Sequence, residues 1–179
     1  MSDPISAEGC LASAGVETWT LLADAYLKAK LPLRAYAVYL KIYREFPESR
    51  EAESALFLLA KLEDDRGDSD AANRRFAEYL ARYEHGEFAE EVMWRQAMLQ
   101  VHARRFQLSI QLLERLVSSH PDGARIGDAL FLLGSIYDRE LENTERARTY
   151  YQRYLQLPEA DEQVRETTRQ RLSDLPDGK

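Results

Sequence analysis

The stretch ALFLL at residues 55–59 returns unchanged at residues 129–133. The offset of 74 residues is twice 37, and positions 37 residues apart carry side chains of the same kind. Large residues recur at Trp19, Leu56, Met93 and Leu130, and small residues recur at Ala23, Ala60, Ala97 and Gly134. A fixed period of this length predicts that the chain stacks several copies of one supersecondary unit.

Each copy predicts two helices. In the first copy, Trp19, Ala23 and Tyr26 are spaced by four and three residues, which places them on one helical face. Pro32 interrupts this helix, and Tyr39 belongs to the apolar face of the next one. The small residue lets the paired helix approach closely. Because no strand-like alternation or hairpin turn appears, the predicted fold class is all-α.

The composition excludes several classes of protein. The chain has 179 residues, 45% of them hydrophobic, and a formal net charge of −7. This acidity argues against a nucleic-acid partner, because phosphate contacts need a basic surface. No apolar run is long enough to cross a bilayer, so we expect no direct membrane insertion. The single cysteine, Cys10, cannot form an internal disulfide bond.

Catalytic and metal-binding motifs are absent from the sequence. His85, His102 and His120 lack the spacing of zinc ligands, and no glycine-rich phosphate loop occurs. We therefore expect that the protein is not an enzyme and that it needs no cofactor and no metal.

The residues of the first and fourth copies carry a known pattern. Residues 19–26 read WTLLADAY and are followed by AYAVY at 35–39 and by Pro47. Residues 130–137 read LFLLGSIY and are followed by ARTYY at 147–151 and by Pro158. The turn before ARTYY is one residue longer than the corresponding turn of the first copy. This pattern resembles the tetratricopeptide repeat family, W-x2-L-G-x2-Y, then A-x3-F, then P. The resemblance implies a right-handed superhelical solenoid of about four helical hairpins and a non-catalytic role in binding other proteins.

The expected domain organisation follows from the repeat boundaries. We expect a flexible segment at 1–15, four repeats over 16–160 (16–52, 53–89, 90–126 and 127–160), and a C-terminal capping helix and tail at 161–179. The last segment carries apolar residues on one side only and charged residues elsewhere, as a terminal cap of a stacked array requires.

Two longer phrases suggest a narrower resemblance. FPESREAESALFLLA at 46–60 and SHPDGARIGDALFLLG at 119–134 are similar in phrasing to bacterial cell-envelope members of the family, the Tol–Pal cell-division coordinator and the outer-membrane-assembly lipoprotein. This resemblance implies a place in a bacterial multiprotein assembly. The start of the sequence has no signal peptide as written, which favours the cytoplasm; the periplasm is the alternative if the sequence is an excised domain.

The resemblance also implies that first helices line a concave groove. The residue after each large core residue should point into it, which selects an aromatic ladder with Met98 beside it and acids around it. The predicted groove residues are Phe57, Trp94, Met98 and Phe131, with the rim acids Asp24, Asp64, Glu91 and Asp128, and with Glu17 and Asp138 further along.

Two alternatives stay open for these aromatic residues. They could pack against the adjacent first helix instead of facing the groove. For the third copy, a shift by one residue would make Trp94, Ala97, Met98 and Val101 the core set and would explain the polar Gln96.

The predicted function is that of a scaffold or adaptor. First helices carry a net negative charge and second helices a net positive one, which favours an apolar, basic-flanked peptide or helix in the groove. Lys61 and Arg95 are the only cations near the groove positions, so a site for a peptide carboxylate is disfavoured. The alternatives are a secretion-type chaperone that shields an apolar segment of an exported client, and self-assembly into a homo-oligomer.

Overall fold

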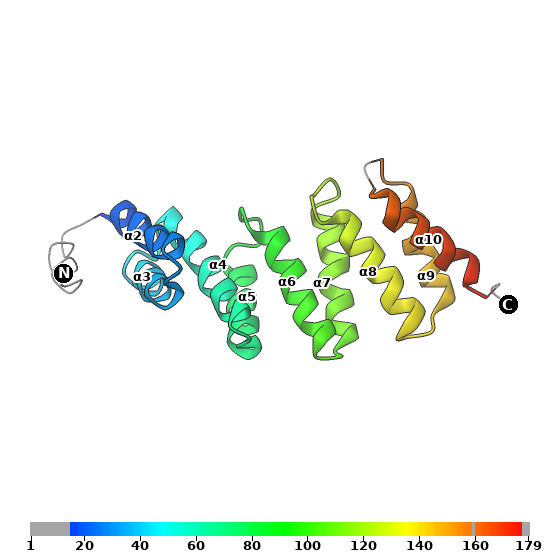
Figure 1. The fold of residues 1–179 in the computed structure, drawn as a ribbon, viewed down its shortest axis with the longest axis horizontal. Helices are drawn as coiled ribbons and strands as arrows, with labels where there is room; N and C mark the ends of the chain where they lie inside the picture. The colour runs from blue at the N-terminus through cyan, green and yellow to red at the C-terminus, as the bar shows by residue number, and fades with distance from the viewer. Residues whose placement is uncertain (1–14, 159, 177–179) are drawn as a thin grey trace. The chain divides into compact units, whose positions relative to one another are not determined.

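A computed structural model describes residues 15–158 and 160–176 of the chain. Within these residues the regular secondary structure is helical and there is no strand, so the predicted all-α fold class is confirmed (Figure 1). The expected flexible segment lies outside the described residues except for Gly15, as do Cys10 and residues 177–179 of the expected tail.

The chain divides into two compact units, residues 1–89 and 90–179. The helices of the first unit are α2 (Val16–Lys28), α3 (Pro32–Glu45), α4 (Arg50–Asp65) and α5 (Ser69–Arg82). The helices of the second unit are α6 (Ala89–His102), α7 (Phe106–Ser119), α8 (Ile126–Arg139), α9 (Thr144–Leu155) and α10 (Glu162–Asp174), of which α6 begins at the last residue of the first unit.

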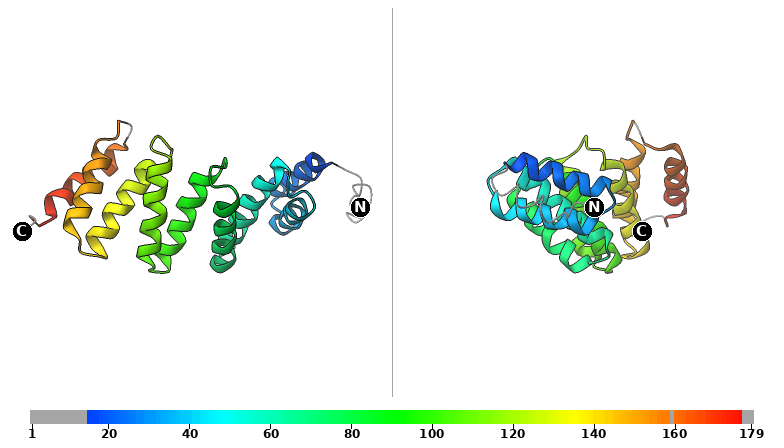
Figure 2. Two further views of the ribbon diagram at one scale, coloured as in Figure 1. Left: turned by 180° about the vertical axis from the view of Figure 1, so that it is seen from behind. Right: turned by 60° about the vertical axis from the view of Figure 1, so that its left-hand side comes forward.

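Within each unit, helices from α2 to α5 and from α7 to α10 pack on the helix that precedes or follows them in the chain. In the first unit α3 lies between α2 and α4, and α5 packs on α4. In the second unit α8 lies between α7 and α9, and α10 packs on α9 (Figure 2). Each unit therefore has the helical hairpin as its building block, as the two helices per repeat predict.

A residue with left-handed backbone conformation closes the turn inside each hairpin. These residues are Lys30, Gly67, Arg104 and Glu142, with φ of 57°, 80°, 55° and 51°. The first three are 37 residues apart, and the fourth is displaced by the one extra residue that the sequence shows in this turn. In the first hairpin the next residue, Leu31, donates its N–H to the carbonyl oxygen of Tyr26 at 2.8 Å, which closes the end of α2.

Small residues let the two helices of a hairpin touch. Ala23 is completely buried against the core of the first hairpin, where Tyr39 is 1% exposed. The contact is closest in the last hairpin, because a Cβ atom on Gly134 would lie 2.5 Å from the ring of Tyr151. Burial, followed by the carboxylate of Asp138, raises the pKa of Tyr151, so this phenol stays neutral.

A half-buried carboxylate joins one hairpin to the start of the next repeat. Glu53 on α4 accepts hydrogen bonds from the Tyr79 hydroxyl at 2.6 Å and from the Glu87 backbone N–H at 2.7 Å. The Tyr79 hydroxyl accepts in turn from the Phe88 N–H at 2.9 Å. Gly86 makes room for the carboxylate, since a Cβ atom there would lie 2.2 Å from Glu53 Oε1. We call this arrangement the junction clamp.

The second unit repeats the clamp's glutamate, backbone N–H and glycine 37 residues later, while Leu116 stands at the position of Tyr79. Glu90 on α6 accepts a hydrogen bond from the Arg125 backbone N–H at 2.6 Å. Gly123 stands at the position of Gly86, and a Cβ atom there would lie 2.2 Å from Glu90 Oε1. The pairing of a helix glutamate with a loop glycine is therefore a periodic property of the chain.

The third repeat keeps the unshifted register. Met93 and Ala97 are completely buried, Gln96 is 8% exposed, and Trp94 is only half-buried. The polar Gln96 thus occupies the core side of α6, and the shifted core set is not adopted.

We predict that Gly134→Ala destabilises the protein by about 1–3 kcal/mol relative to Gly127→Ala, because the new methyl group overlaps the Tyr151 ring. Gly127→Ala is the matched control in the same helix, since its Cβ atom would lie 3.5 Å from Tyr154 and 3.6 Å from Leu157, ordinary contact distances. Urea unfolding followed by circular dichroism measures the difference. Equal free energies of unfolding would contradict the close contact.

We also predict that Glu53→Ala lowers the free energy of unfolding by about 1–3 kcal/mol more than Glu51→Ala, because it leaves the Tyr79 hydroxyl and a backbone N–H without their acceptor. Both glutamates lie in the first turn of α4, so the two variants remove the same charge from the same helix end. Thermal and urea unfolding measure the effect, and indistinguishable variants would show that the clamp contributes nothing.

Candidate partner-binding pocket

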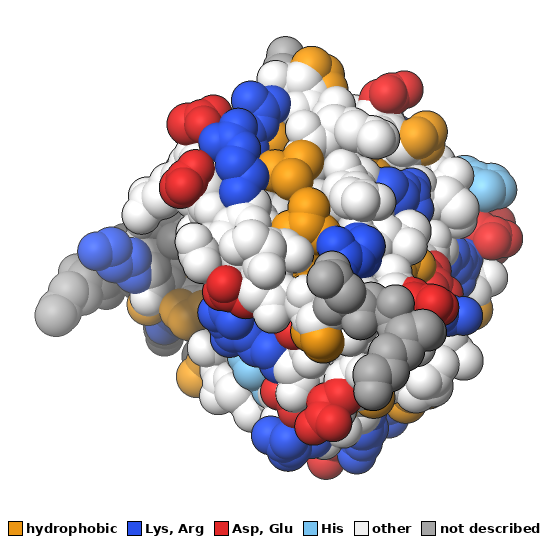
Figure 3. Space-filling view, turned by 90° about the vertical axis from the view of Figure 1, so that its right-hand side faces the viewer, with side chains coloured by type: hydrophobic (Ala, Val, Ile, Leu, Met, Phe, Trp, Pro, Cys, Tyr) orange, Lys and Arg blue, Asp and Glu red, His pale blue; other side chains and the backbone are white. Residues whose placement is uncertain are grey.

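A pocket of about 640 Å³ opens in the second unit. It lies between the loop at 121–124, the start of α8, the end of α9 and the start of α10, and we call it the α8–α10 pocket. Figure 3 shows the face of the molecule at this end of the chain, where hydrophobic side chains lie among acidic and basic ones. Its size is in the range of sites that hold small ligands or single peptide side chains.

Aromatic and aliphatic side chains form the apolar part of the pocket. Phe131 on α8 is half-buried, and its ring centre lies 6.0 Å from those of Tyr151 and Tyr154. Tyr154, Leu157 and Val164 line the opposite side. The pocket therefore offers a ring face and aliphatic walls that a partner's side chain can cover.

The polar part of the pocket is acidic. Asp122, Asp128 and Asp161 line it, and none of the described lining residues is Lys or Arg. Asp128 accepts a hydrogen bond from Arg125 at 3.1 Å, and Asp161 caps α10 by accepting from the Val164 N–H at 3.0 Å. Carboxylates close to an apolar surface favour a cationic ligand over an anionic one.

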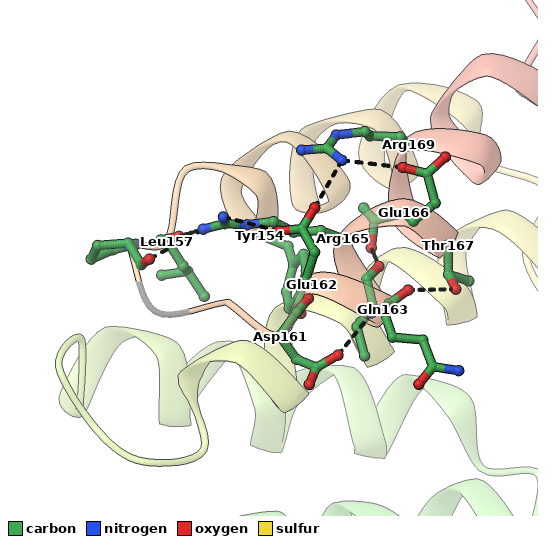
Figure 4. Close-up of polar contacts among 12 residues, drawn as sticks. Tyr154, Leu157, Asp161, Glu162, Gln163, Arg165, Glu166, Thr167 and Arg169 are labelled. Atoms are coloured by element: carbon green, nitrogen blue, oxygen red, sulfur yellow. Dashed lines mark hydrogen bonds and ion pairs between the residues drawn. The ribbon is translucent and has the colours of Figure 1, made fainter.

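The wall formed by α9 and α10 is held by Arg165 (Figure 4). Its guanidinium donates to the carbonyl oxygens of Leu157 at 2.5 Å and Pro158 at 3.2 Å, and it pairs with Glu162 at 3.5 Å. Burial, followed by the nearby Asp161 carboxylate, raises the pKa of Tyr154. The phenol is thus neutral at physiological pH, and its hydroxyl donates to the backbone carbonyl oxygen of Asp161 at 3.5 Å.

Arg125 connects three of the predicted site residues in the second unit. Its Nη2 lies 2.8 Å from a carboxylate oxygen of Glu91, and its Nη1 lies 3.1 Å from Asp128. Its guanidinium carbon lies 5.5 Å from the ring centre of Trp94. Trp94 is therefore covered by a cation of its own chain. Met98, on the same helix, is half-buried.

The predicted site residues of the first unit have structural contacts. Phe57 is only 8% exposed because the ring of Phe88 stacks on it, with centres 4.4 Å apart and an interplanar angle of 4°. Asp24 accepts a hydrogen bond from the Tyr39 hydroxyl at 2.7 Å, and Asp64 is half-buried on α4. Of the eight predicted residues, the α8–α10 pocket brings together Asp128 and Phe131. The binding role of all eight stays a prediction.

Several residues that create the pocket are not recognisable as binding residues from the sequence. Tyr154 lies on α9, Leu157 in the connection that follows it and Val164 on the predicted capping helix α10, so no sequence pattern marked them as a binding surface. Gly127 was recognisable, because it stands 37 residues after Glu90 and 74 after Glu53, where the clamp needs a glutamate. The consequence of glycine at this position becomes clear only from the contacts of the clamp in the structure.

Two further searches concern only the residues that the structure describes. No group of three or more His, Cys, Asp or Glu side chains is placed to hold a metal ion. No helix in that part of the chain is sufficiently long and apolar to cross a membrane.

Comparisons with known proteins agree with the helical hairpins. The sequence model of the tetratricopeptide repeat family matches residues 57–124 and 95–163. No curated protein matches the sequence.

Three solved structures are similar in fold. BtubC (BKLC) from P. vanneervenii is 19% identical with a TM-score of 0.66, over 89% of this chain and 71% of that one. Tetratricopeptide-like repeats of a putative kinesin light chain from Podosopora anserina are 12% identical with a TM-score of 0.63, over 88% and 83%. MamA from Desulfovibrio magneticus RS-1 is 18% identical with a TM-score of 0.59, over 89% and 92%. At these identities the likeness shows the fold alone.

Proposed function

Because the chain belongs to the tetratricopeptide repeat family, we propose that it is a non-catalytic protein-interaction scaffold that binds an apolar, basic-flanked peptide or helix. The observation that carries this proposal is the α8–α10 pocket, which combines the Phe131 ring with three aspartates and no described basic lining residue. The proposal assigns residues 16–160 to repeats that present this site and 161–179 to a cap that completes its wall.

The apolar part of the pocket supplies affinity. Interfaces take most of their binding energy from a few side chains buried in well-packed pockets, and aromatic anchors predominate among them. Phe131 and Tyr154 are such anchors, because helices on both sides hold their rings. A partner that packs aliphatic or planar groups against them buries apolar surface on both molecules.

The charges of the pocket determine which partner is preferred. Asp122, Asp128 and Asp161 attract basic residues and repel acidic ones. The two cations predicted near the groove are paired within their own helices, Lys61 with Asp65 at 3.2 Å and Arg95 with Glu91 at 2.7 Å. Both pairings weaken the case for a site that binds a peptide carboxylate.

In this proposal Phe131 and Asp128 contact the partner, while Phe57 and Trp94 support the surfaces of their own repeats. A place in a bacterial multiprotein assembly follows from the phrasing of residues 46–60 and 119–134 and forms part of the proposal. A secretion-type chaperone would use the same pocket, and it differs by releasing its client instead of remaining in the assembly.

We predict that a fluorescently labelled peptide with leucines between basic residues binds the full chain, and that Phe131→Ala weakens this binding at least about tenfold through loss of an anchor. Fluorescence anisotropy measures the dissociation constant. Leu108→Ala is the control, since Leu108 is 48% exposed on α7 and does not line the pocket.

Two further peptides test the chemistry. Replacing the basic flanks by glutamates should abolish binding, and replacing the leucines by serines should weaken it strongly. Raising the salt concentration should weaken binding of the basic peptide, because the aspartates of the pocket are partly exposed and salt screens their charge. Equal binding of the acidic peptide, or unchanged binding to Phe131→Ala, would contradict the proposed function.

A further inference from the structure

A planar group of the chain itself covers the first two aromatic residues of the ladder. The Phe88 ring stacks on Phe57 at 4.4 Å, and the Arg125 guanidinium lies over Trp94 at 5.5 Å. Each covering residue stands directly before a first helix, because α6 begins at Ala89 and α8 at Ile126. The residue at this position therefore decides what lies on the preceding aromatic ring.

The charge of the residue three positions before each aromatic residue is complementary to the charge of the group that covers the ring. Ser54 stands before Phe57, and the cover there is the uncharged Phe88 ring. Glu91 stands before Trp94, and the cover is Arg125, which donates from Nε to Glu91 at 2.9 Å. Residues three apart lie on the same helical face, so the acid and the ring together hold a guanidinium.

The third position repeats the acid and the ring but not the cover. Asp128 stands three residues before Phe131 on α8. The 37-residue period puts Glu162, the first residue of α10, at the position of Arg125, and its carboxylate pairs with Arg165 at 3.5 Å and with Arg169 at 3.2 Å. An acid at this position supplies neither an aromatic ring nor a guanidinium to lie on Phe131, and Phe131 lines the α8–α10 pocket.

The junction clamp is also missing at this position, which leaves the space open. Gly127 replaces the clamp glutamate, and Ala160 stands 37 residues after Gly123, where the clamp needs a glycine. Both partners of the clamp have therefore changed together. The volume that a glutamate side chain fills at the earlier junctions belongs here to the pocket.

We infer that the α8–α10 pocket binds an arginine side chain of the partner, with its guanidinium stacked on Phe131 and ion-paired with Asp128. The geometry is the one that Arg125 adopts on Trp94 and Glu91 within the same unit. Asp128 already accepts one hydrogen bond from Arg125, and a carboxylate can accept several. Asp161 adds a second negative charge at the pocket.

Arginine fits this site better than lysine for physical reasons. The guanidinium is flat, is more weakly hydrated than an ammonium group, and can stack on a ring while it donates in its plane to a carboxylate. Lysine offers the same charge without the plane. This inference rests on the proposed function and names the side chain that its basic ligand places in the pocket.

Three matched peptides test the inference on the full chain. They are fluorescently labelled and identical except for one central residue between leucines, which is arginine, lysine or citrulline. Citrulline keeps the planar shape without the charge, and lysine keeps the charge without the plane. We expect the arginine peptide to bind about tenfold more tightly than either of the others, as measured by fluorescence anisotropy.

Protein variants test whether Phe131 and Asp128 cause the preference for arginine. Phe131→Leu keeps an apolar side chain but loses the ring, so the ratio of arginine to lysine affinity should fall to about one. Asp128→Asn should remove the advantage of arginine over citrulline. Glu145→Gln is the control for charge, because Glu145 is exposed in the first turn of α9 and does not line the pocket.

Gly127→Gln tests whether arginine binding needs the open volume of the α8–α10 pocket. It places a neutral side chain of the clamp's length in the pocket, so arginine binding should be lost without any change in charge. Circular dichroism and the thermal midpoint show whether this variant folds, and Phe131→Leu decides if it does not.

The outcomes separate the two proposals. Arginine and lysine peptides of equal affinity would overturn the arginine pocket and leave the scaffold with a basic ligand in place. Binding that survives both Gly127→Gln and Phe131→Leu would also overturn it. If none of the three peptides binds the unmodified chain, the proposed function fails together with the inference.

Discussion

The structure depends on how each repeat is joined to the next one, and the half-buried glutamate of the junction clamp governs this joint. Glu53 gathers a tyrosine hydroxyl and a backbone N–H from elements far along the chain, and Glu90 does the same for the Arg125 N–H. Each carboxylate accepts a backbone N–H from the loop that leads into the following first helix, so each clamp holds the entry to that helix in a defined place. That entry residue then lies on the aromatic side chain of the preceding first helix.

The pocket lies at the junction where the clamp is missing. Where Gly127 replaces the glutamate, no clamp carboxylate fills the junction, and the ring contacts of Phe131 are with Tyr151 and Tyr154 of the same hairpin instead of with a residue at the start of α10. The surface left open is apolar on one side and acidic on the other, and Arg165 fixes its far wall through two backbone carbonyls. A site thus arises where the repeat departs from its own pattern, while the undisturbed junctions are structural.

Much of the fold could be predicted because it repeats. The 37-residue period locates the buried Met93 and Ala97, the hairpin turns and the extra turn residue before Glu142. The candidate site could be predicted only in part. Phe131 and Asp128 follow from their places beside the core, but Phe57 and Trp94 occur in the same pattern and are covered. The covering residues lie 31 positions further on in the sequence, and periodicity within one helix carries no information about them.

The sequence by itself determined the repeat, the helical hairpins and their core, because helix periodicity and close packing act over neighbouring residues and return with every copy. Tertiary structure alone decided which aromatic ring stays open. That outcome depends on contacts between a helix and the start of a later one, where a carboxylate, a glycine and a planar side chain compete for one volume. At two junctions the chain fills this volume itself, and beside Phe131 it leaves the volume to a ligand-sized pocket.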